Sequence, residues 1–148
     1  MDCIRVLVVE DEYIVGEDLR GALQDLGYQV SILVTSGEEA IKRAGEERPD
    51  IILMDIVLTG EIDGIGAADE IRNRFNIPVI FLTAYTDKKT IDQAKRIYPF
   101  EYLIKPFEPR ELHSTIEIVL NKAHMEQKLR EAAEEREKLI EKPQAAKS

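Results

Sequence analysis

The stretch RVLVVEDEYI, residues 5–14, places a run of apolar residues directly before the acids Glu10, Asp11 and Glu12. Such a short apolar run is typical of a strand that is buried on both faces of a sheet. Like charges at its end repel one another and resist burial. Either the acids face water where the strand ends, or they form part of a cation site.

Composition limits the classes of protein that the chain can belong to. Its 148 residues, 44% of them apolar, suit one domain with an appendage. A net charge of −9 argues against direct nucleic-acid binding, and Cys3, the only cysteine, excludes an internal disulfide. There is no signal-peptide layout, and no apolar stretch approaches the ~18 residues of a membrane span. We therefore expect a cytoplasmic protein without membrane insertion.

Short apolar runs alternate with segments of helical periodicity. Strands are predicted over residues 4–9, 28–34, 50–54, 78–82 and 100–104. Helices are predicted over residues 12–26, 36–47, 64–75 and 87–98, and from Pro109 onward. This alternation predicts an α/β fold in which helices cover both faces of a parallel sheet. For a domain of this size we expect the flavodoxin-like, doubly wound, five-stranded order 2-1-3-4-5.

Polar residues stand where these predicted strands end. These polar residues are Glu10, Asp11, Asp55, Thr83 and Lys105. Ligands of such sheets bind outside the carboxyl ends of the strands, so these side chains should meet. Carboxylates crowded together are costly unless a cation such as Mg²⁺, which prefers oxygen ligands, lies between them. The added ammonium group suits a site that receives a phosphoryl group better than one that only stores metal.

Four motifs carry a resemblance to a known family. VLVVEDE, IILMDIVL, VIFLTAY and EYLIKPF resemble, in order and spacing, the receiver domain of two-component response regulators, over about residues 3–121. The resemblance implies that Asp55 accepts a phosphoryl group from a phosphohistidine on a sensor histidine kinase. It also implies that Glu10, Asp11, Asp55 and the backbone carbonyl of Val57 hold Mg²⁺.

The same resemblance assigns roles near the last two strands. Lys105 would pair with the phosphoryl group, and Thr83 would hydrogen-bond it once it is attached. Tyr102 matches the aromatic residue that moves with Thr83 in the switch, and the Lys105–Pro106 bond would be cis. The protein would be a switch that assists its own phosphorylation and dephosphorylation, and not a turnover enzyme.

Two features depart from the common form of the family. The first acid is Glu10 where aspartate is commoner. The loop after Asp55 is longer, so Asp63–Gly64 matches the family's Asp-Gly only if about two residues are inserted. The longer loop after Asp55 is therefore a feature of this chain that the common form of the family lacks.

Two alternatives remain beside the phosphorylated receiver. One is a receiver-like interaction module that works without phosphate. The other is a Mg²⁺-dependent phosphohydrolase, which would want a second aspartate at the position of Val57. His113 and His124 are interpreted as helix-surface residues.

The predicted domains are a receiver over residues 1–122 and a charged helical extension over 123–148, with a disordered tail from 142. Within the extension, apolar residues keep a 4-3-7 spacing at Met125, Leu129, Ala132 and Leu139, and Arg136 takes the missing step. This favours a single charged helix, a short coiled coil or a linker. Candidate surfaces for a homodimer are this extension and the face formed by residues 87–98, 100–104 and the last helix. We recognise no output domain, and neither the cognate kinase nor a downstream protein partner is indicated.

Overall fold

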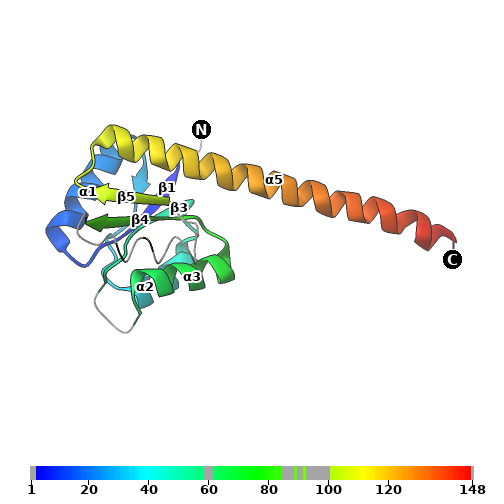
Figure 1. Ribbon diagram of the computed structural model, residues 1–148, viewed down its shortest axis with the longest axis horizontal. Helices are drawn as coiled ribbons and strands as arrows, with labels where there is room; N and C mark the ends of the chain where they lie inside the picture. The colour runs from blue at the N-terminus through cyan, green and yellow to red at the C-terminus, as the bar shows by residue number, and fades with distance from the viewer. Residues whose placement is uncertain (1–2, 59–61, 85–88, 90–91, 93–100, 148) are drawn as a thin grey trace.

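The computed structural model describes residues 3–58, 62–84, 89, 92 and 101–147. Its strands form one parallel sheet in the order β2-β1-β3-β4-β5 (Figure 1). The strands are β1 Arg5–Val9, β2 Gln29–Val30, β3 Ile51–Asp55, β4 Val79–Ala84 and β5 Glu101–Lys105. The predicted flavodoxin-like order is confirmed. Because all strands run the same way, their carboxyl ends share one edge of the sheet.

Helices cover both faces of this sheet. They are α1 Tyr13–Asp25, α2 Gly37–Glu47, α3 Gly64–Phe75 and α5 Pro109–Lys147. Figure 1 shows α1 and α5 on one face, and α2 and α3 on the other. Alternate residues of each buried strand supply the two cores: Leu7 and Met54 pack toward α2 and α3, while Val8 and Leu53 pack toward α1 and α5. The helix predicted over residues 87–98 lies outside the described residues, apart from Lys89 and Asp92.

The second strand is shorter than the sequence predicts. Instead of residues 28–34, only Gln29–Val30 pair as a strand, and Val34 returns as an isolated bridge to Val9. Between them Leu33 turns toward α1, where a Cβ on Gly16 would lie only 2.5 Å from Leu33 Cδ1. Packing against the helix thus divides the apolar run. The returning bridge lets Val34 O accept a hydrogen bond of 2.9 Å from the Glu10 backbone N–H.

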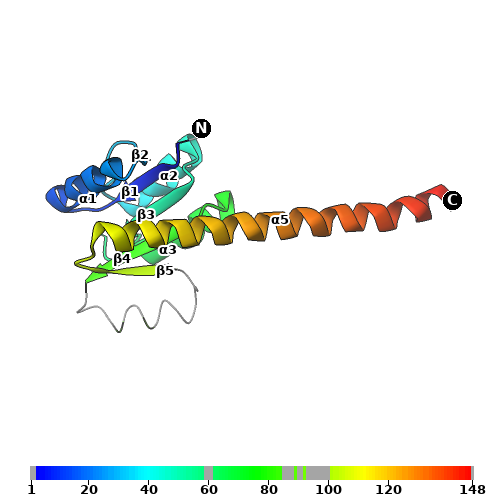
Figure 2. The same ribbon diagram turned by 90° about the horizontal axis from the view of Figure 1, so that it is seen from above.

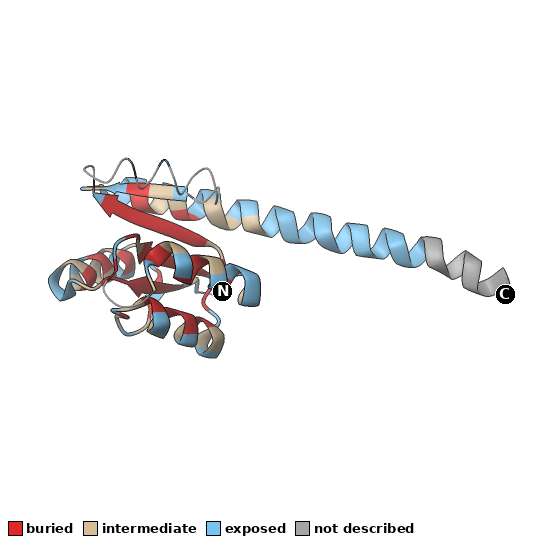
Figure 3. Ribbon diagram, turned by 60° about the horizontal axis from the view of Figure 1, so that its bottom comes forward, coloured by how far each residue is buried: buried red, intermediate tan, exposed pale blue. Residues whose placement is uncertain are grey.

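The last helix is much longer than the sheet that it covers. Figure 2 shows α5 running well past the domain. Its side chains are buried or half-buried at several positions up to Ala123, and those from His124 to Leu139 are exposed (Figure 3). The helix itself is continuous across residue 122, so the predicted domain boundary there stays a prediction. Among the described helices, none combines enough length with enough hydropathy to cross a bilayer.

The end of this helix differs from the sequence prediction. A disordered tail is predicted from residue 142, whereas the backbone helix continues through Pro143 to Lys147. Glutamine, alanine and lysine after the proline are favourable helix formers, although the proline itself removes one backbone hydrogen bond.

Candidate phosphoacceptor and metal site

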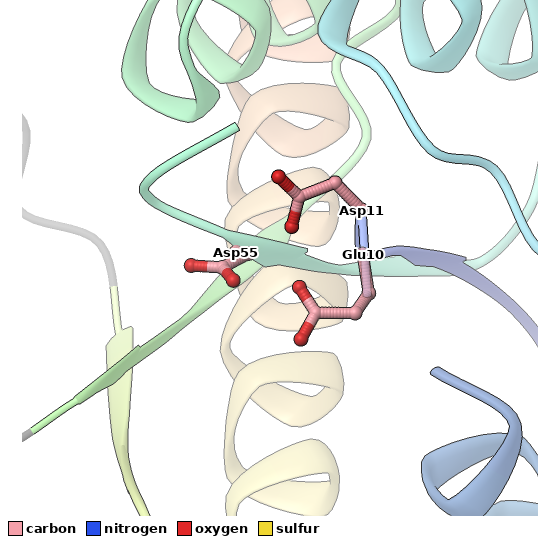
Figure 4. A group of neighbouring side chains, drawn as sticks. All are labelled: Glu10, Asp11 and Asp55. Atoms are coloured by element: carbon pink, nitrogen blue, oxygen red, sulfur yellow. The ribbon is translucent and has the colours of Figure 1, made fainter. Parts of the chain in front are cut away.

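Three carboxylates meet at the carboxyl edge of the sheet. Glu10 and Asp11 follow β1, and Asp55 is the last residue of β3. Figure 4 shows the three side chains converging, and one oxygen of each lies within 4.8 Å of the others. The register explains this, because Val9 is paired with Met54 and the next residue of each strand carries an acid.

Lys105 reaches these acids from the end of β5. Its Nζ lies 2.9 Å from Glu10 Oε1 and 3.5 Å from Asp55 Oδ2. Burial alone would lower the pKa of this lysine, but Glu10 and Asp55 outweigh that effect and raise it. The site therefore holds a fixed positive charge beside the Asp55 carboxylate.

Glu10 is the most constrained of the three acids. It is 1% exposed, and burial, together with its contact with Asp55, raises its pKa to about 7 although Lys105 opposes the shift. Its Oε2 has no hydrogen-bond partner among the described residues. A buried acceptor left unpaired costs roughly 1–3 kcal/mol. An oxygen-preferring divalent cation would supply the missing partner, so these carboxylates fit Mg²⁺.

The loop after β3 holds the Asp55 side chain and closes tightly behind it. The Val57 backbone N–H donates to Asp55 Oδ1 at 3.1 Å. Gly64 N–H donates to Ile56 O at 3.0 Å. A Cβ at Gly64 would lie 2.2 Å from the Asp55 carbonyl oxygen, so this position has no room for a side chain. Coordination by the Val57 carbonyl stays a prediction.

Thr83 and Tyr102 lie on the two neighbouring strands beyond β3. Thr83 is 1% exposed, and its hydroxyl donates to the Ala84 carbonyl at 3.3 Å. Tyr102 stacks on Phe81 with a centroid distance of 5.4 Å, and burial raises the pKa of its phenol. The Lys105–Pro106 bond is cis.

Comparison with known proteins identifies the family of this fold and site. The model of the response regulator receiver domain matches residues 6–117. The chain belongs to the response regulator receiver family. The receiver is 33% identical over 118 residues to the transcriptional regulatory protein PdtaR of Mycobacterium tuberculosis, covering 80% of this chain and 57% of that protein. It is 34% identical to the probable transcriptional regulator ycf27 of Guillardia theta, covering 81% of this chain and 46% of that protein. The receiver thus spans about half the length of the curated relatives it matches.

Solved receiver domains agree with this assignment. The signal receiver domain of a modulated diguanylate cyclase from Desulfovibrio desulfuricans G20 is 42% identical, with a TM-score of 0.78, over 84% of this chain and 99% of that one. The receiver domain of the sensor histidine kinase PA1611 from Pseudomonas aeruginosa PAO1, solved with a magnesium ion in its active-site cleft, is 34% identical. Its TM-score is 0.70 over 81% of this chain and 99% of that one. Receiver domains of two-component systems are signalling switches that take phosphoryl groups from histidine kinases.

The structure shows one contact of the segment between Asp55 and α3 that the sequence did not indicate. Glu38 Oε1, at the start of α2, accepts a hydrogen bond of 2.9 Å from the Ile62 backbone N–H. A first-turn acid is ordinarily explained by the helix dipole alone, which hides such a role. Glu38 thus ties the loop after Asp55 to a neighbouring helix.

His113 also has a contact that its helix-surface interpretation missed. Its Nδ1 lies 2.9 Å from the Tyr28 hydroxyl, and its Nε2 lies 3.2 Å from Glu117 Oε1. The first contact joins α5 to Tyr28, just before β2, whereas the second lies within α5, and both are separate from the carboxylate site. His124 is exposed, as the sequence predicts.

Proposed function

We propose that the receiver takes a phosphoryl group from a sensor histidine kinase onto Asp55 in a Mg²⁺-dependent reaction, and that this switches a protein-interaction surface. One observation carries the proposal most. The Lys105 ammonium lies between the Asp55 carboxylate and the buried Glu10, one of whose oxygens lacks a partner among the described residues. A purely structural cluster has no use for such an arrangement.

The hydrogen bonds to Asp55 indicate which oxygen reacts. Oδ1 is held by the Val57 N–H, which leaves Oδ2, the oxygen nearer Lys105, to attack phosphorus. A P–O bond forms as the P–N bond to the kinase imidazole breaks, and the imidazole keeps the electron pair. The product is an acyl phosphate. Positioning and charge neutralisation carry most of such a transfer.

The acidic and basic groups around Asp55 then bind different parts of the reacting complex. Glu10, Asp11, Asp55 and the Val57 carbonyl would hold the cation. Bound Mg²⁺ neutralises charge on the phosphoryl oxygens. Lys105 moves from Glu10 to a phosphoryl oxygen, which it can reach because its ammonium already lies between Glu10 and Asp55.

The surface beside Asp55 supports a protein donor over a small substrate. Tyr13 and Ile14 at the start of α1, and Val57 beyond the acceptor, are large apolar side chains that are more than half exposed. Tyr13 and Ile14 closely follow Asp11 in the sequence, and Val57 follows Asp55; exposed apolar side chains beside a site favour contact with another protein. A phosphohydrolase of the aspartyl-phosphate type would want an acid where Val57 stands.

The readout is proposed to begin at Thr83. A phosphoryl group on Asp55 would draw the Thr83 hydroxyl away from the Ala84 carbonyl. Tyr102, whose partner on β4 is Phe81, two residues before Thr83, would then change its packing on that phenylalanine. New charge would thus bias an element with two arrangements.

Intact-mass measurement after incubation with acetyl phosphate tests the acceptor. Wild type should gain about 80 Da, one phosphoryl group, only with Mg²⁺, and Asp55→Asn should gain nothing. The matched control is Asp25→Asn, which changes an exposed acid at the end of α1 and should behave like wild type. No gain in wild type, where another receiver is modified under the same conditions, would favour the phosphate-independent interaction module.

A further inference from the structure

A stripe of apolar side chains on α5 is left in water. Ile118 is 61% exposed, Met125 57%, Leu129 67% and Leu139 68%, and Ala132 between them is exposed too. We call these five residues the outer seam. From Met125 to Leu139 they follow the alternating 4-3 spacing of a coiled coil, with Arg136 as the one polar step. Apolar side chains gathered on one helix face mark an interaction surface.

The outer seam faces away from the domain. The opposite stripe of α5 packs on the sheet through Leu112 and Ile116. Further along that stripe Arg130 Nη1 and Nη2 lie 3.0 and 3.1 Å from the Asn76 amide oxygen, once the amide is turned toward them. At about 100° per residue the two stripes lie on opposite sides of the helix. A second helix can therefore pack on the outer seam without meeting the receiver that carries it.

We propose that the outer seam binds the same segment of a second copy of this chain, in antiparallel orientation over residues 122–139. Orientation follows from the two basic residues at core positions, Lys122 and Arg136. In a parallel pair, each of these basic residues would face the identical basic residue of the second copy. In an antiparallel pair centred between Leu129 and Ala132, Lys122 faces Leu139 of the second copy, and Arg136 faces Met125 of the second copy. Their aliphatic stems can cover those apolar groups while the charges reach water.

The residues that flank the seam agree with that orientation. Lys128 and Glu135 occupy equivalent edge positions, one heptad apart. Antiparallel pairing brings Lys128 beside Glu135 of the second copy, and two-fold symmetry repeats the contact. Parallel pairing would set Lys128 beside Ala133 instead. The paired stretch is about 26 Å long, so the dimer should be weak and depend on concentration.

Sedimentation equilibrium of the full chain tests whether the seam pairs. Wild type should shift from monomer to dimer with concentration, and Leu129→Glu should remain a monomer. The matched control is His124→Glu, which adds the same charge on an exposed part of the helix outside the seam. A monomeric wild type at all concentrations, or a Leu129→Glu variant that still dimerises, would overturn the proposal. Asp55→Asn should dimerise like wild type, because the seam does not depend on phosphorylation.

A charge exchange tests the orientation. Lys128→Glu and Glu135→Lys should each weaken the dimer roughly fivefold, since each spoils two exposed ion pairs. Combining both substitutions should restore the wild-type dissociation constant. Single variants without effect, or a double variant that stays weak, would overturn the antiparallel arrangement.

Discussion

Charged residues at the amino end and at the carboxyl end of the strands differ in how their polar groups are paired. At the amino end, the Arg5 N–H donates to Asp50 Oδ2 at 2.8 Å, the Asp50 N–H donates to Arg5 O, and the Arg5 guanidinium bonds the Arg48 carbonyl. At the carboxyl end, Glu10 and Asp55 both depend on Lys105, and a buried oxygen of Glu10 lacks a partner among the described residues. The first arrangement completes the fold. The second leaves a buried carboxylate oxygen unpaired, which is unfavourable for folding and agrees with the proposed function of this edge.

The largest expected effect comes from replacing one basic residue at each edge of the sheet. It is an effect on the rate of phosphorylation, and it is expected at the carboxyl edge alone. Lys105→Met should slow phosphorylation by acetyl phosphate about a hundredfold or more, because it removes a positioned charge from the transferring group. Arg5→Met should leave that rate unchanged and cost about 1 kcal/mol of stability through its lost hydrogen bond. The rate of mass gain and thermal unfolding measure the two effects. Equal losses of rate would erase the proposed difference between the two ends.

Two glycines offer a second contrast. A Cβ at Gly64 would lie 2.2 Å from the Asp55 carbonyl oxygen, whereas one at Gly21 in α1 would meet nothing within 4 Å. Gly64→Ala should therefore displace the acceptor, lower stability by roughly 1–3 kcal/mol and slow phosphorylation. Gly21→Ala should raise stability by about 0.5–1 kcal/mol without changing the rate. A Gly64→Ala variant that unfolds and reacts like wild type would show that the loop relaxes freely.

The raised pKa of Glu10 predicts opposite pH trends with and without the cation. Its pKa lies near 7, above the ordinary 4.5, mainly because the group is buried. In metal-free protein its contribution to stability is therefore full below pH 4.5 and is lost as pH rises through about 7. Mg²⁺ affinity should rise over the same window, because the cation requires the carboxylate.

Glu10→Gln separates this effect from the titration of other groups. The variant cannot ionise at position 10, so its Mg²⁺ affinity should be weaker and should vary less with pH over that window. Mg²⁺ titrations at a series of pH values, and thermal unfolding without metal, measure both trends. A wild-type affinity that stays constant as pH rises toward 7 would contradict the assignment.

The sequence predicted the meeting of the strand-end residues better than their surroundings. Position along a parallel sheet was enough to bring Glu10, Asp55 and Lys105 together, because strand ends share an edge. It could not show that Glu10 is buried while Glu12 is exposed. That difference depends on the return of Val34 beside β1, a detail set by packing against α1.

The sequence analysis also missed contacts between segments that lie far apart along the chain. Glu38 binds a backbone amide 24 residues away, and His113 meets Tyr28 across 85 residues. Periodicity places both side chains on exposed helix turns. It carries no information about which loop lies opposite those turns, so neither contact could be predicted from one sequence.

A reporter at position 102 would show how far a change at the carboxyl end of the sheet extends along β5. The expected signal is the smallest of the predicted effects. The chain has no tryptophan, so Tyr102→Trp would report from the half-buried position that now stacks on Phe81. Phosphorylation should alter its fluorescence, because Thr83 moves toward the phosphoryl group and frees space beside the ring. The control His124→Trp, on the exposed part of α5, should not respond.

Thr83→Ala in the Tyr102→Trp background completes this test. The double variant should still gain the phosphoryl mass, because Asp55 and Lys105 are intact, yet its fluorescence should no longer change. A full mass gain with unchanged fluorescence in Tyr102→Trp itself would confine the response to the carboxyl edge. A response that persists without the Thr83 hydroxyl would mean that the phosphoryl charge reaches Tyr102 by another route, and Thr83 would then lose its role as the first moving part.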